Sequence, residues 1–378
     1  MNLRIGIYIE AVKVSSKTGI SRHIIGLVEA LVKENSGNLY YLYYQVNLFE
    51  KEKLNWLRGL PNIKLRPLPF PSTWLTEHPT IWWKYYLPLK VWKDNVDVFH
   101  GPNHFIPLSG NIAKVVTIHD LAYYYMNVHG EGIDRVLKMW TNQAMQNADV
   151  IVSVSQSTAN DCIKEGVPKE KVKVVYQGFE PAISDVTERD TIKSERPYIL
   201  FVGTIQPRKN VEYIVQSFSQ VKDSISHDLI LAGAPGDSNS AVEKLINDLK
   251  LKDRVTLTGY ISDERRHLLY KYADIFVYPS KYEGFGLVLL EAMSYGIPVI
   301  TASNSALKEA AGNAALYCDG QTTKSLADAL NSLISNKEIK DDLVKKGYEQ
   351  IKKFTWQNCA QQMLSIYELA AQKSAYRR

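Results

Sequence analysis

The chain has 378 residues, of which 45% are hydrophobic and 22% are charged, and its formal net charge is +5 at pH 7. The length is large for one hydrophobic core and predicts two domains, and the composition is that of an ordinary globular protein. The charge is too small to indicate a nucleic-acid-binding protein, although it favours anionic ligands or an anionic membrane surface.

The three cysteines, Cys162, Cys318 and Cys359, are far apart in the sequence and lack the spacing of a metal site. We expect them to be buried thiols in a reducing compartment. No apolar run is as long as a membrane-spanning helix, and the chain after Met1 runs straight into a strand pattern rather than a signal peptide. We therefore expect a cytoplasmic protein, with peripheral contact at the inner face of the cell membrane as an open alternative.

The first strand and helix pattern covers residues 3–9 and 24–33, and the connecting loop contains Gly19 and Arg22. A glycine before a helix start leaves backbone N–H groups open to an anion. A plain strand-to-helix turn is the alternative for these residues.

Two further strands are predicted at residues 39–45 and 62–66, with Pro67 ending the second of them. The segment 71–93 then interleaves tryptophans and tyrosines with lysines. Such a segment can lie at a membrane interface, or it can pack as a helix in the core, and its composition does not decide between the two.

A buried strand at residues 114–118 is followed directly by His119 and Asp120. Ligands of open α/β sheets bind outside the carboxyl ends of the strands, so His119 is a candidate site residue. A histidine there can donate to a sugar hydroxyl or stabilise developing charge, whereas the alternative is a histidine that only caps the loop.

The remainder of this half continues the alternation of strands and helices. Helices are predicted at residues 132–147 and 157–165, and strands at 149–155 and 172–175. Ser155 is the expected N-cap of the second helix.

Residues 185–197 are polar and lack apolar periodicity, which predicts an interdomain linker. A new buried strand follows at residues 198–202, and its loop contains Arg208 and Lys209 before a helix that begins at Val211. Two adjacent cations at such a turn can neutralise a diphosphate, although two solvated loop cations are the alternative.

Regular strand–helix alternation in the second half predicts another parallel sheet covered on both faces. The expected strands are 229–233, 255–259, 274–279, 298–302 and 314–318, and the expected helices are 241–249, 263–272 and 354–371.

Between two of these strands lies the stretch that carries most functional information, Tyr282 to Met293. Its glycines, Gly284 and Gly286, allow close approach of a ligand to the backbone at a helix start, which favours phosphate. Glu283 in the turn and Glu291 on the helix can each accept hydrogen bonds from neighbouring hydroxyls. A sugar nucleotide combines both chemistries, whereas a solvated turn glutamate and a helix-face glutamate are the alternative.

The sequence Glu283-Gly284-Phe285-Gly286, with a second glutamate at Glu291, resembles the paired-glutamate motif of retaining glycosyltransferases of family four. The resemblance implies the GT-B architecture, an α/β fold in which two Rossmann-like domains with parallel sheets face a central cleft. The implied acceptor domain covers residues 1–185 and the crossover helix 356–378. A linker at 186–197 then leads to a nucleotide-sugar donor domain at 198–355.

The same resemblance implies roles for individual residues, with His119 and Glu283 as the catalytic pair. The implied donor-binding residues are Gly19, Arg208, Lys209, Gly259, Tyr260, Phe285, Gly286, Leu287 and Glu291. The implied acceptor contacts are Arg22, Asn103 and His104. Thr204 stands where many family members carry an arginine, so the phosphate role falls to Arg208 and Lys209. No metal is expected, because no Asp-x-Asp motif follows a strand.

The implied activity is retaining transfer of a hexose from a nucleotide-diphosphate sugar to a glycan or lipid-linked acceptor in cell-surface polysaccharide synthesis. The Pro207-Arg208-Lys209-Asn210 loop is similar to that of bacterial mannosyl- and rhamnosyltransferases, which favours mannose and GDP-mannose. A sugar-nucleotide epimerase of the same fold, a non-catalytic glycan-binding protein and a glycoside hydrolase are the alternatives.

Overall fold

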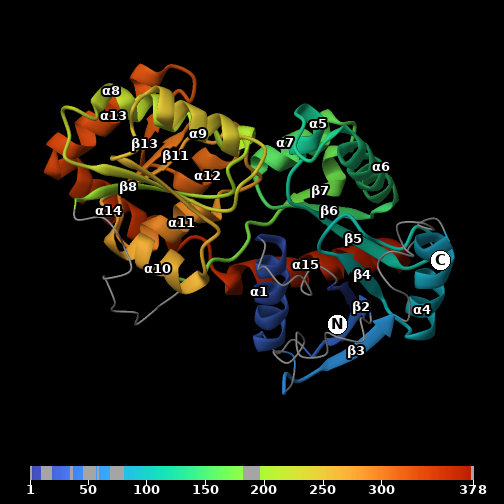
Figure 1. Ribbon diagram of the computed structural model, residues 1–378. Helices are drawn as coiled ribbons and strands as arrows, with labels where there is room; N and C mark the ends of the chain where they lie inside the picture. Colours follow the sequence, from blue (N-terminus) through green and yellow to red (C-terminus); the bar gives the residue numbers. More distant parts are fainter. Residues whose placement is uncertain are drawn as a thin grey trace. The chain divides into compact units, whose positions relative to one another are not determined.

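A computed structural model describes residues 2–9, 19–34, 37–45, 57, 59–68, 81–181 and 196–375 (Figure 1). The chain forms two compact units. Unit 1 is Met1–Gly178 with Phe354–Arg378, and unit 2 is Phe179–Lys353. Most of the predicted linker, together with residues 71–80 of the aromatic segment, lies outside the described residues.

Unit 1 contains a seven-stranded parallel sheet with the strand order β3-β2-β1-β4-β5-β6-β7. The strands are β1 (Arg4–Tyr8), β2 (Leu39–Gln45), β3 (Ile63–Leu68), β4 (Val98–Gly101), β5 (Ala113–Ile118), β6 (Val150–Ser153) and β7 (Val172–Val174). The order reverses between β1 and β4, which are hydrogen-bonded neighbours. In open α/β sheets, ligands bind beside such a reversal, outside the carboxyl ends of the strands.

Helices cover both faces of this sheet, as the near-continuous burial of its central strands requires. One face packs against α1 (Gly19–Lys33) and α15 (Trp356–Ala375). The other face packs against a π-helical turn (Trp82–Tyr86), α4 (Leu87–Lys93), α6 (Glu131–Asn147) and α7 (Gln156–Lys164), with the short α5 (Ala122–Tyr125) alongside. Ser155 caps α7 as predicted, because its hydroxyl accepts from the Thr158 N–H at 3.0 Å.

The prediction that Pro67 ends a strand is wrong, because β3 continues through this residue to Leu68. The strand β3 lies at the edge of the sheet and pairs only with β2 among the described strands. An edge strand tolerates proline, since one of its sides needs no N–H donor.

Unit 2 contains a six-stranded parallel sheet with the order β10-β9-β8-β11-β12-β13, reversing between β8 and β11. The strands are β8 (Tyr198–Val202), β9 (Asp228–Ala232), β10 (Val255–Gly259), β11 (Ile275–Tyr278), β12 (Val299–Ala302) and β13 (Ala315–Cys318). The helices are α8 (Val211–Val221), α9 (Asn239–Asp248), α10 (Asp263–Tyr272), α11 (Leu287–Ser294), α12 (Leu307–Ala311), α13 (Thr323–Ser335) and α14 (Lys337–Ile351). The predicted pair of parallel α/β sheets is therefore confirmed.

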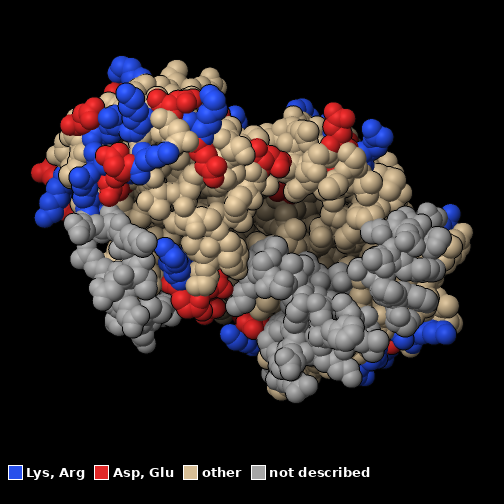
Figure 2. Space-filling model, viewed as in Figure 1, with Lys and Arg blue, Asp and Glu red and all other residues tan. Residues whose placement is uncertain are grey.

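The surface of unit 2 in Figure 2 shows charged side chains of both signs mixed over α8 and α9. This is the usual surface of a helix that faces water. In the part of the chain that the structure describes, no helix is both long and apolar enough to cross a membrane.

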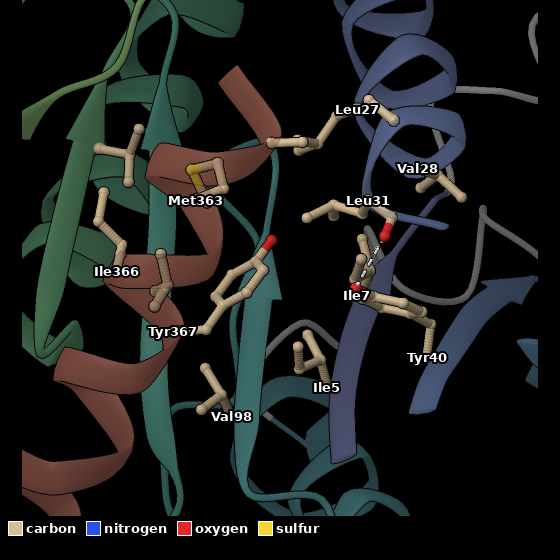
Figure 3. Packing of buried hydrophobic residues seen from close by; sticks show 14 of the residues in the cluster. Ile5, Ile7, Leu27, Val28, Leu31, Tyr40, Val98, Met363, Ile366 and Tyr367 are labelled. Carbon is tan, nitrogen blue, oxygen red and sulfur yellow. Dashed lines mark hydrogen bonds between the residues drawn. The ribbon is translucent and has the colours of Figure 1, made fainter. Parts of the chain in front are cut away.

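The C-terminal helix α15 belongs to the core of unit 1, although it follows unit 2 in the sequence (Figure 1). Figure 3 shows Met363, Ile366 and Tyr367 of α15 packed with residues of β1 and α1. At its start, Trp356 packs so tightly that a Cβ on Gly26 of α1 or on Gly178 would lie 2.3 Å from the indole ring. Glycine at these positions therefore makes room for the tryptophan.

We predict that Gly26→Ala lowers the stability of unit 1 by about 1–3 kcal/mol, the usual cost of overpacking. The matched control is Gly132→Ala in α6, where a new Cβ meets no atom within 4 Å. Thermal unfolding of both variants measures the effect. Equal melting temperatures for the two variants would show that Trp356 of α15 does not pack tightly against Gly26 of α1.

Candidate functional site

In unit 2, the loops after β8 and β11 lie beside each other, because these strands are neighbours in the sheet. The first loop contains Arg208 and Lys209, followed by Asn210 in a left-handed conformation with φ 61°. The Asn210 amide donates to the carbonyl groups of Pro279 and Gly320 at 3.2 and 2.9 Å. Asparagine tolerates this backbone region, and its side chain fixes the loop to the loops after β11 and β13.

The side chain of Glu283 is the centre of a buried ionic cluster, and only 11% of it is exposed. Its Oε2 lies 3.0 Å from Arg208 Nη1, and its Oε1 lies 2.6 Å from Lys209 Nζ. Arg208 and Lys209 in the loop after β8 therefore form one contact group with Glu283 in the loop after β11. Two cations and one carboxylate leave the group with a formal charge of +1.

Two hydroxyl groups complete the shell around Glu283 Oε1. The hydroxyls of Ser280 and Tyr278 donate to this oxygen at 2.6 and 3.0 Å, and Lys209 Nζ also bonds the Tyr278 hydroxyl. The backbone N–H of Glu283 donates to Ser305 Oγ at 3.0 Å. Neither Tyr278, Ser280 nor Ser305 was predicted as a site residue, since nothing in the sequence marks them as partners of Glu283.

The pKa of Glu283 is set by opposing effects. Burial alone would raise this pKa, but the charges of Lys209 and Arg208 outweigh the burial and lower it to about 2. Burial and the neighbouring Glu283 carboxylate raise the pKa of Tyr278. At neutral pH the cluster therefore holds an ionised glutamate beside a neutral tyrosine.

The helix α11 begins directly after this loop. Its N-cap, Gly286, has φ 110°, a conformation that favours glycine, and a Cβ there would lie 3.1 Å from Leu307. Phe285 is buried, and Leu287 is the first residue of the helix. The positive end of the α11 helix dipole gives the +1 cluster a second source of positive potential.

Glu291 lies further along α11 and is held separately from Glu283. Its side chain is 17% exposed, and its Oε2 lies 4.0 Å from Arg266 Nε of α10. The two glutamates of the motif therefore have different cationic partners among the described residues.

The neighbouring edge of the sheet is formed by Gly203 and Gly233, which follow β8 and β9, and by Gly259, the last residue of β10. A Cβ on Gly233 would lie 2.1 Å from the carbonyl oxygen of Gly203, so only glycine fits there. Gly259 has φ 67°, and the next residue, Tyr260, has 73% of its surface exposed. A ligand at this edge of the sheet would therefore meet backbone groups and the exposed ring of Tyr260.

In unit 1, His119 follows β5 and its Nε2 lies 2.8 Å from the Pro102 carbonyl oxygen. A carbonyl only accepts, so Nε2 must carry the proton and Nδ1 is left as an acceptor when the ring is neutral. Asp120 acts on this ring through its charge, which raises the pKa of His119, while its Oδ1 accepts from the Ala122 N–H at 3.0 Å. Donation by His119 to a ligand would require the bond to Pro102 to open.

Four of the chain's eight histidines form a cluster in unit 1. The rings of His23 and His119 meet edge to face at 4.9 Å. His100 in β4 bonds the hydroxyls of Tyr367 and Thr117, both at 2.8 Å. Sequence analysis did not select His23 or His100, since each lies inside an ordinary helix or strand pattern.

Burial lowers the pKa of every histidine in this cluster, and the mutual repulsion of the rings lowers it further for all but His119. The pKa values of His100 and His104 fall to about 3 and about 4. Those of His23 and His119 are also lowered. The cluster is therefore neutral at pH 7, and its nitrogens act through hydrogen bonds.

The remaining predicted residues of unit 1 lie in two places. Gly19 is the first residue of α1, and Arg22 lies one turn further. Asn103 and His104 belong to the loop after β4, where Asn103 Oδ1 accepts from the His104 N–H at 2.9 Å. Unit 1 thus contains the predicted histidine and acceptor residues, and unit 2 contains the predicted phosphate and glutamate residues.

Two family descriptions match the chain. Residues 17–182 match "Glycosyltransferase Family 4", and residues 184–350 match "Glycosyl transferases group 1". The matches divide the chain near the boundary between the first segment of unit 1 and unit 2.

Two O-antigen mannosyltransferases are similar to most of the chain. It is 26% identical to the O-antigen chain mannosyltransferase B of Escherichia coli, over 93% of this chain and 96% of that protein. It is 28% identical to the O-antigen chain mannosyltransferase RfbU of Salmonella typhimurium, over 68% of this chain and 71% of that protein.

Solved structures show the same fold at lower identity. Sucrose-phosphate synthase from Thermosynechococcus elongatus superposes with a TM-score of 0.76 at 21% identity, covering 97% of this chain and 99% of that one. HepE of Anabaena, solved with UDP and glucose, superposes with a TM-score of 0.72 at 18% identity, covering 97% and 100%.

We predict that Glu283→Gln destabilises unit 2 by about 3 kcal/mol at pH 7, because two buried cations lose their anion. The lowered pKa means that the ionised carboxylate stabilises the fold above its ordinary pKa of 4.5, and that this stabilisation is lost as the pH falls to about 2. The gap between wild type and variant should therefore be constant from pH 5 to pH 8 and close below about 4.5. Denaturant unfolding across pH measures it.

The matched control for that prediction is Asp328→Asn, which removes an exposed carboxylate paired with Lys324. This change should alter the free energy of unfolding by less than about 1 kcal/mol. A Glu283→Gln variant as stable as this control would show that the ionic cluster does not stabilise unit 2.

Proposed function

Because the chain belongs to the glycosyltransferases, with a family 4 half followed by a group 1 half, we propose that it transfers mannose from GDP-mannose to a glycan or lipid-linked acceptor. It is an enzyme of the glycosyltransferase class. The choice of mannose is supported by the two O-antigen mannosyltransferases among its relatives. The proposed setting is cell-surface polysaccharide synthesis.

The observation that carries the donor assignment is the position of the Arg208–Lys209–Glu283 cluster. It lies at the strand-order reversal of unit 2, next to the start of α11. Net positive charge and a helix N-terminus suit a diphosphate, and the carboxylates of Glu283 and Glu291 suit the hydroxyls of the sugar and the ribose. Gly259 and Tyr260 are assigned to the base on the neighbouring edge.

Retention of configuration is part of the proposal, with attack on the same face of the sugar and no enzyme nucleophile. The state of Glu283 supports this assignment. Each of its oxygens already accepts from a cation, and a carboxylate with a pKa near 2 is a weak nucleophile. No metal is proposed, because Arg208 and Lys209 supply the countercharge for the departing diphosphate.

His119 is proposed to act as a neutral imidazole. With Nε2 donating to Pro102, Nδ1 would accept from a hydroxyl of the transferred sugar and orient it. The three cysteines are free thiols, which suits the reducing cytoplasm as the place of the reaction.

The experiment that tests the donor site is a thermal-shift screen against GDP, UDP, dTDP and ADP and their hexose conjugates. A ligand at 100 times its Kd stabilises the folded state by about 2.7 kcal/mol, so the proposed donor should raise the melting temperature by several degrees. We expect GDP and GDP-mannose to do so. A shift with UDP or dTDP compounds alone would reject GDP-mannose, and no shift with any nucleotide would reject the donor site.

Steady-state transfer from the donor found in that screen separates the proposed roles. We predict that His119→Ala lowers kcat about 10²-fold with little change in the donor KM, whereas Glu291→Ala mainly raises the donor KM. Lys324→Ala on α13, whose side chain is 80% exposed, is the control and should keep wild-type values. Wild-type kinetics in His119→Ala would remove this residue from the site, and donor conversion without acceptor would indicate an epimerase instead.

A further inference from the structure

The proposed donor site of unit 2 is spread over two elements. Gly259 and Tyr260, where β10 ends, are assigned to the base, and Glu291 on α11 is assigned to the ribose. The helix α10 follows this end of β10 in the chain and lies beside α11 (Figure 1). A side chain of α10 that reaches Glu291 therefore connects the two parts of the site.

Arg266 is a side chain of α10 that reaches Glu291. Its Nη1 lies 3.0 Å from Asp263 Oδ1 in the first turn of α10, and its Nε lies 4.0 Å from Glu291 Oε2. The Arg266 side chain is only 16% exposed, so water screens its charge less than it would screen a surface charge. One guanidinium group thus contacts both the start of α10 and the middle of α11.

The 4.0 Å separation shows how Arg266 acts on Glu291. An N–H···O hydrogen bond needs about 2.7–3.2 Å between its heavy atoms, so Arg266 Nε acts on this carboxylate through its charge. The same Nε atom is buried and has no hydrogen-bond partner among the described residues. An unpaired buried donor destabilises a fold, and a purely structural ion pair would close to bonding distance. The longer distance therefore indicates a role other than holding α10 to α11.

Two tyrosine rings form an uncharged wall beside the Glu291 carboxylate. Tyr270 of α10 and Tyr295 at the end of α11 stack with their ring centroids 5.7 Å apart. Burial raises the pKa of both hydroxyls, and the charge of Glu291 raises it further. Both tyrosines are therefore neutral at pH 7, whereas Arg266 offers Glu291 a positive charge.

A ribose makes a specific demand on the glutamate that binds it. A carboxylate that faces the sugar edge can accept from the 2′ and 3′ hydroxyls at once, whereas a 2′-deoxyribose offers only the 3′ hydroxyl. Both bonds form at little cost only if the carboxylate is held in one orientation before the ligand arrives. The charge of Arg266 beside Oε2 supplies such an orientation.

We infer that Arg266 is a positioning residue for the donor. It holds the Glu291 carboxylate toward the ribose diol and thereby sets a preference for ribonucleotides over 2′-deoxyribonucleotides. Arg266 acts through Glu291 rather than by touching the nucleotide. The inference rests on the proposed donor site and adds to it a residue on α10 and a criterion for the donor's sugar.

The test is calorimetric titration of the full-length protein with GDP and with 2′-deoxy-GDP, or with the same pair of the base that the thermal-shift screen identifies. Wild type should bind the ribonucleotide at least about tenfold more tightly, because the deoxy form lacks one hydrogen bond to a charged acceptor. Arg266→Gln should weaken GDP binding by about tenfold and reduce the preference to less than about threefold.

Two further variants of α10 show whether the position and the charge matter. Arg265→Gln removes the adjacent arginine, which is exposed, and should bind both nucleotides like wild type. Arg266→Lys keeps the charge but lacks the planar fork that contacts Asp263 and Glu291 together, so its preference should be intermediate. This variant also gives a ratio to compare should Arg266→Gln not fold.

A double-mutant cycle with Glu291→Gln separates positioning from direct contact. If Arg266 acts through Glu291, Arg266→Gln should change GDP binding by less than about twofold when Glu291 is already glutamine. A direct contact between Arg266 and the nucleotide would persist in that background. In transfer assays, Arg266→Gln should raise the donor KM about tenfold and keep kcat within about threefold of wild type.

The outcomes distinguish this inference from the donor proposal. Equal ribose preference in wild type and Arg266→Gln would overturn the inference and leave the donor site standing, since both proteins would still bind GDP. Equal binding of GDP and 2′-deoxy-GDP by wild type, or an effect of Arg266→Gln that persists beside Glu291→Gln, would also overturn it. Wild type that binds no nucleotide would reject the donor site and this inference together.

Discussion

The buried carboxylate of Glu283 imposes the strongest constraint on the loops of unit 2. An ionised carboxylate with so little exposure costs several kcal/mol unless cations and hydrogen-bond donors surround it. Arg208 and Lys209 supply the cations from the loop after β8, and Ser280 and Tyr278 supply the donors from the end of β11. These partners come from two neighbouring strands. The bonds that surround the Glu283 carboxylate therefore fix both loops at the strand-order reversal.

The two units differ in the charge of the side chains at the ends of their strands. Unit 2 keeps its charges and pairs them, which leaves one positive charge in excess beside the start of α11. Unit 1 packs four histidines close together, two of them fully buried, and desolvation lowers the pKa of each ring so that the group is neutral at pH 7. A charged cluster suits recognition of a charged diphosphate, whereas neutral rings suit hydrogen bonds to uncharged hydroxyls.

Much of the fold could be predicted from the sequence, because buried parallel strands have a strong local pattern. The strands β2, β8 and β10 and the helix α10 begin and end where they were predicted. The error at Pro67 arose because the edge position of β3 depends on strand order, which a local pattern does not contain.

Fewer features of the site than of the fold could be predicted from the sequence. The sequence located Glu283, Arg208 and Lys209 and assigned them to different parts of one donor, but it did not predict that Lys209 and Glu283 contact each other across 74 residues of sequence. His23 and His100 carried no local signal, because their significance lies in the rings that pack around them. The Glu283 cluster and the histidine cluster both depend on burial and on contacts between distant parts of the sequence. Neither property produces a periodic pattern in the sequence.

The segment at residues 81–93 shows why composition left two interpretations open. Core packing and membrane contact were treated as alternatives, since aromatic residues with lysines are compatible with each. The structure separates them by face, because Trp82 and Leu87 are fully buried while Tyr85 and Trp92 are exposed. Each exposed aromatic ring leaves apolar area in water that burial would stabilise at about 25 cal/mol per Å². Core packing therefore explains the buried face of this helix, whereas the aromatic residues of the other face do not belong to the core.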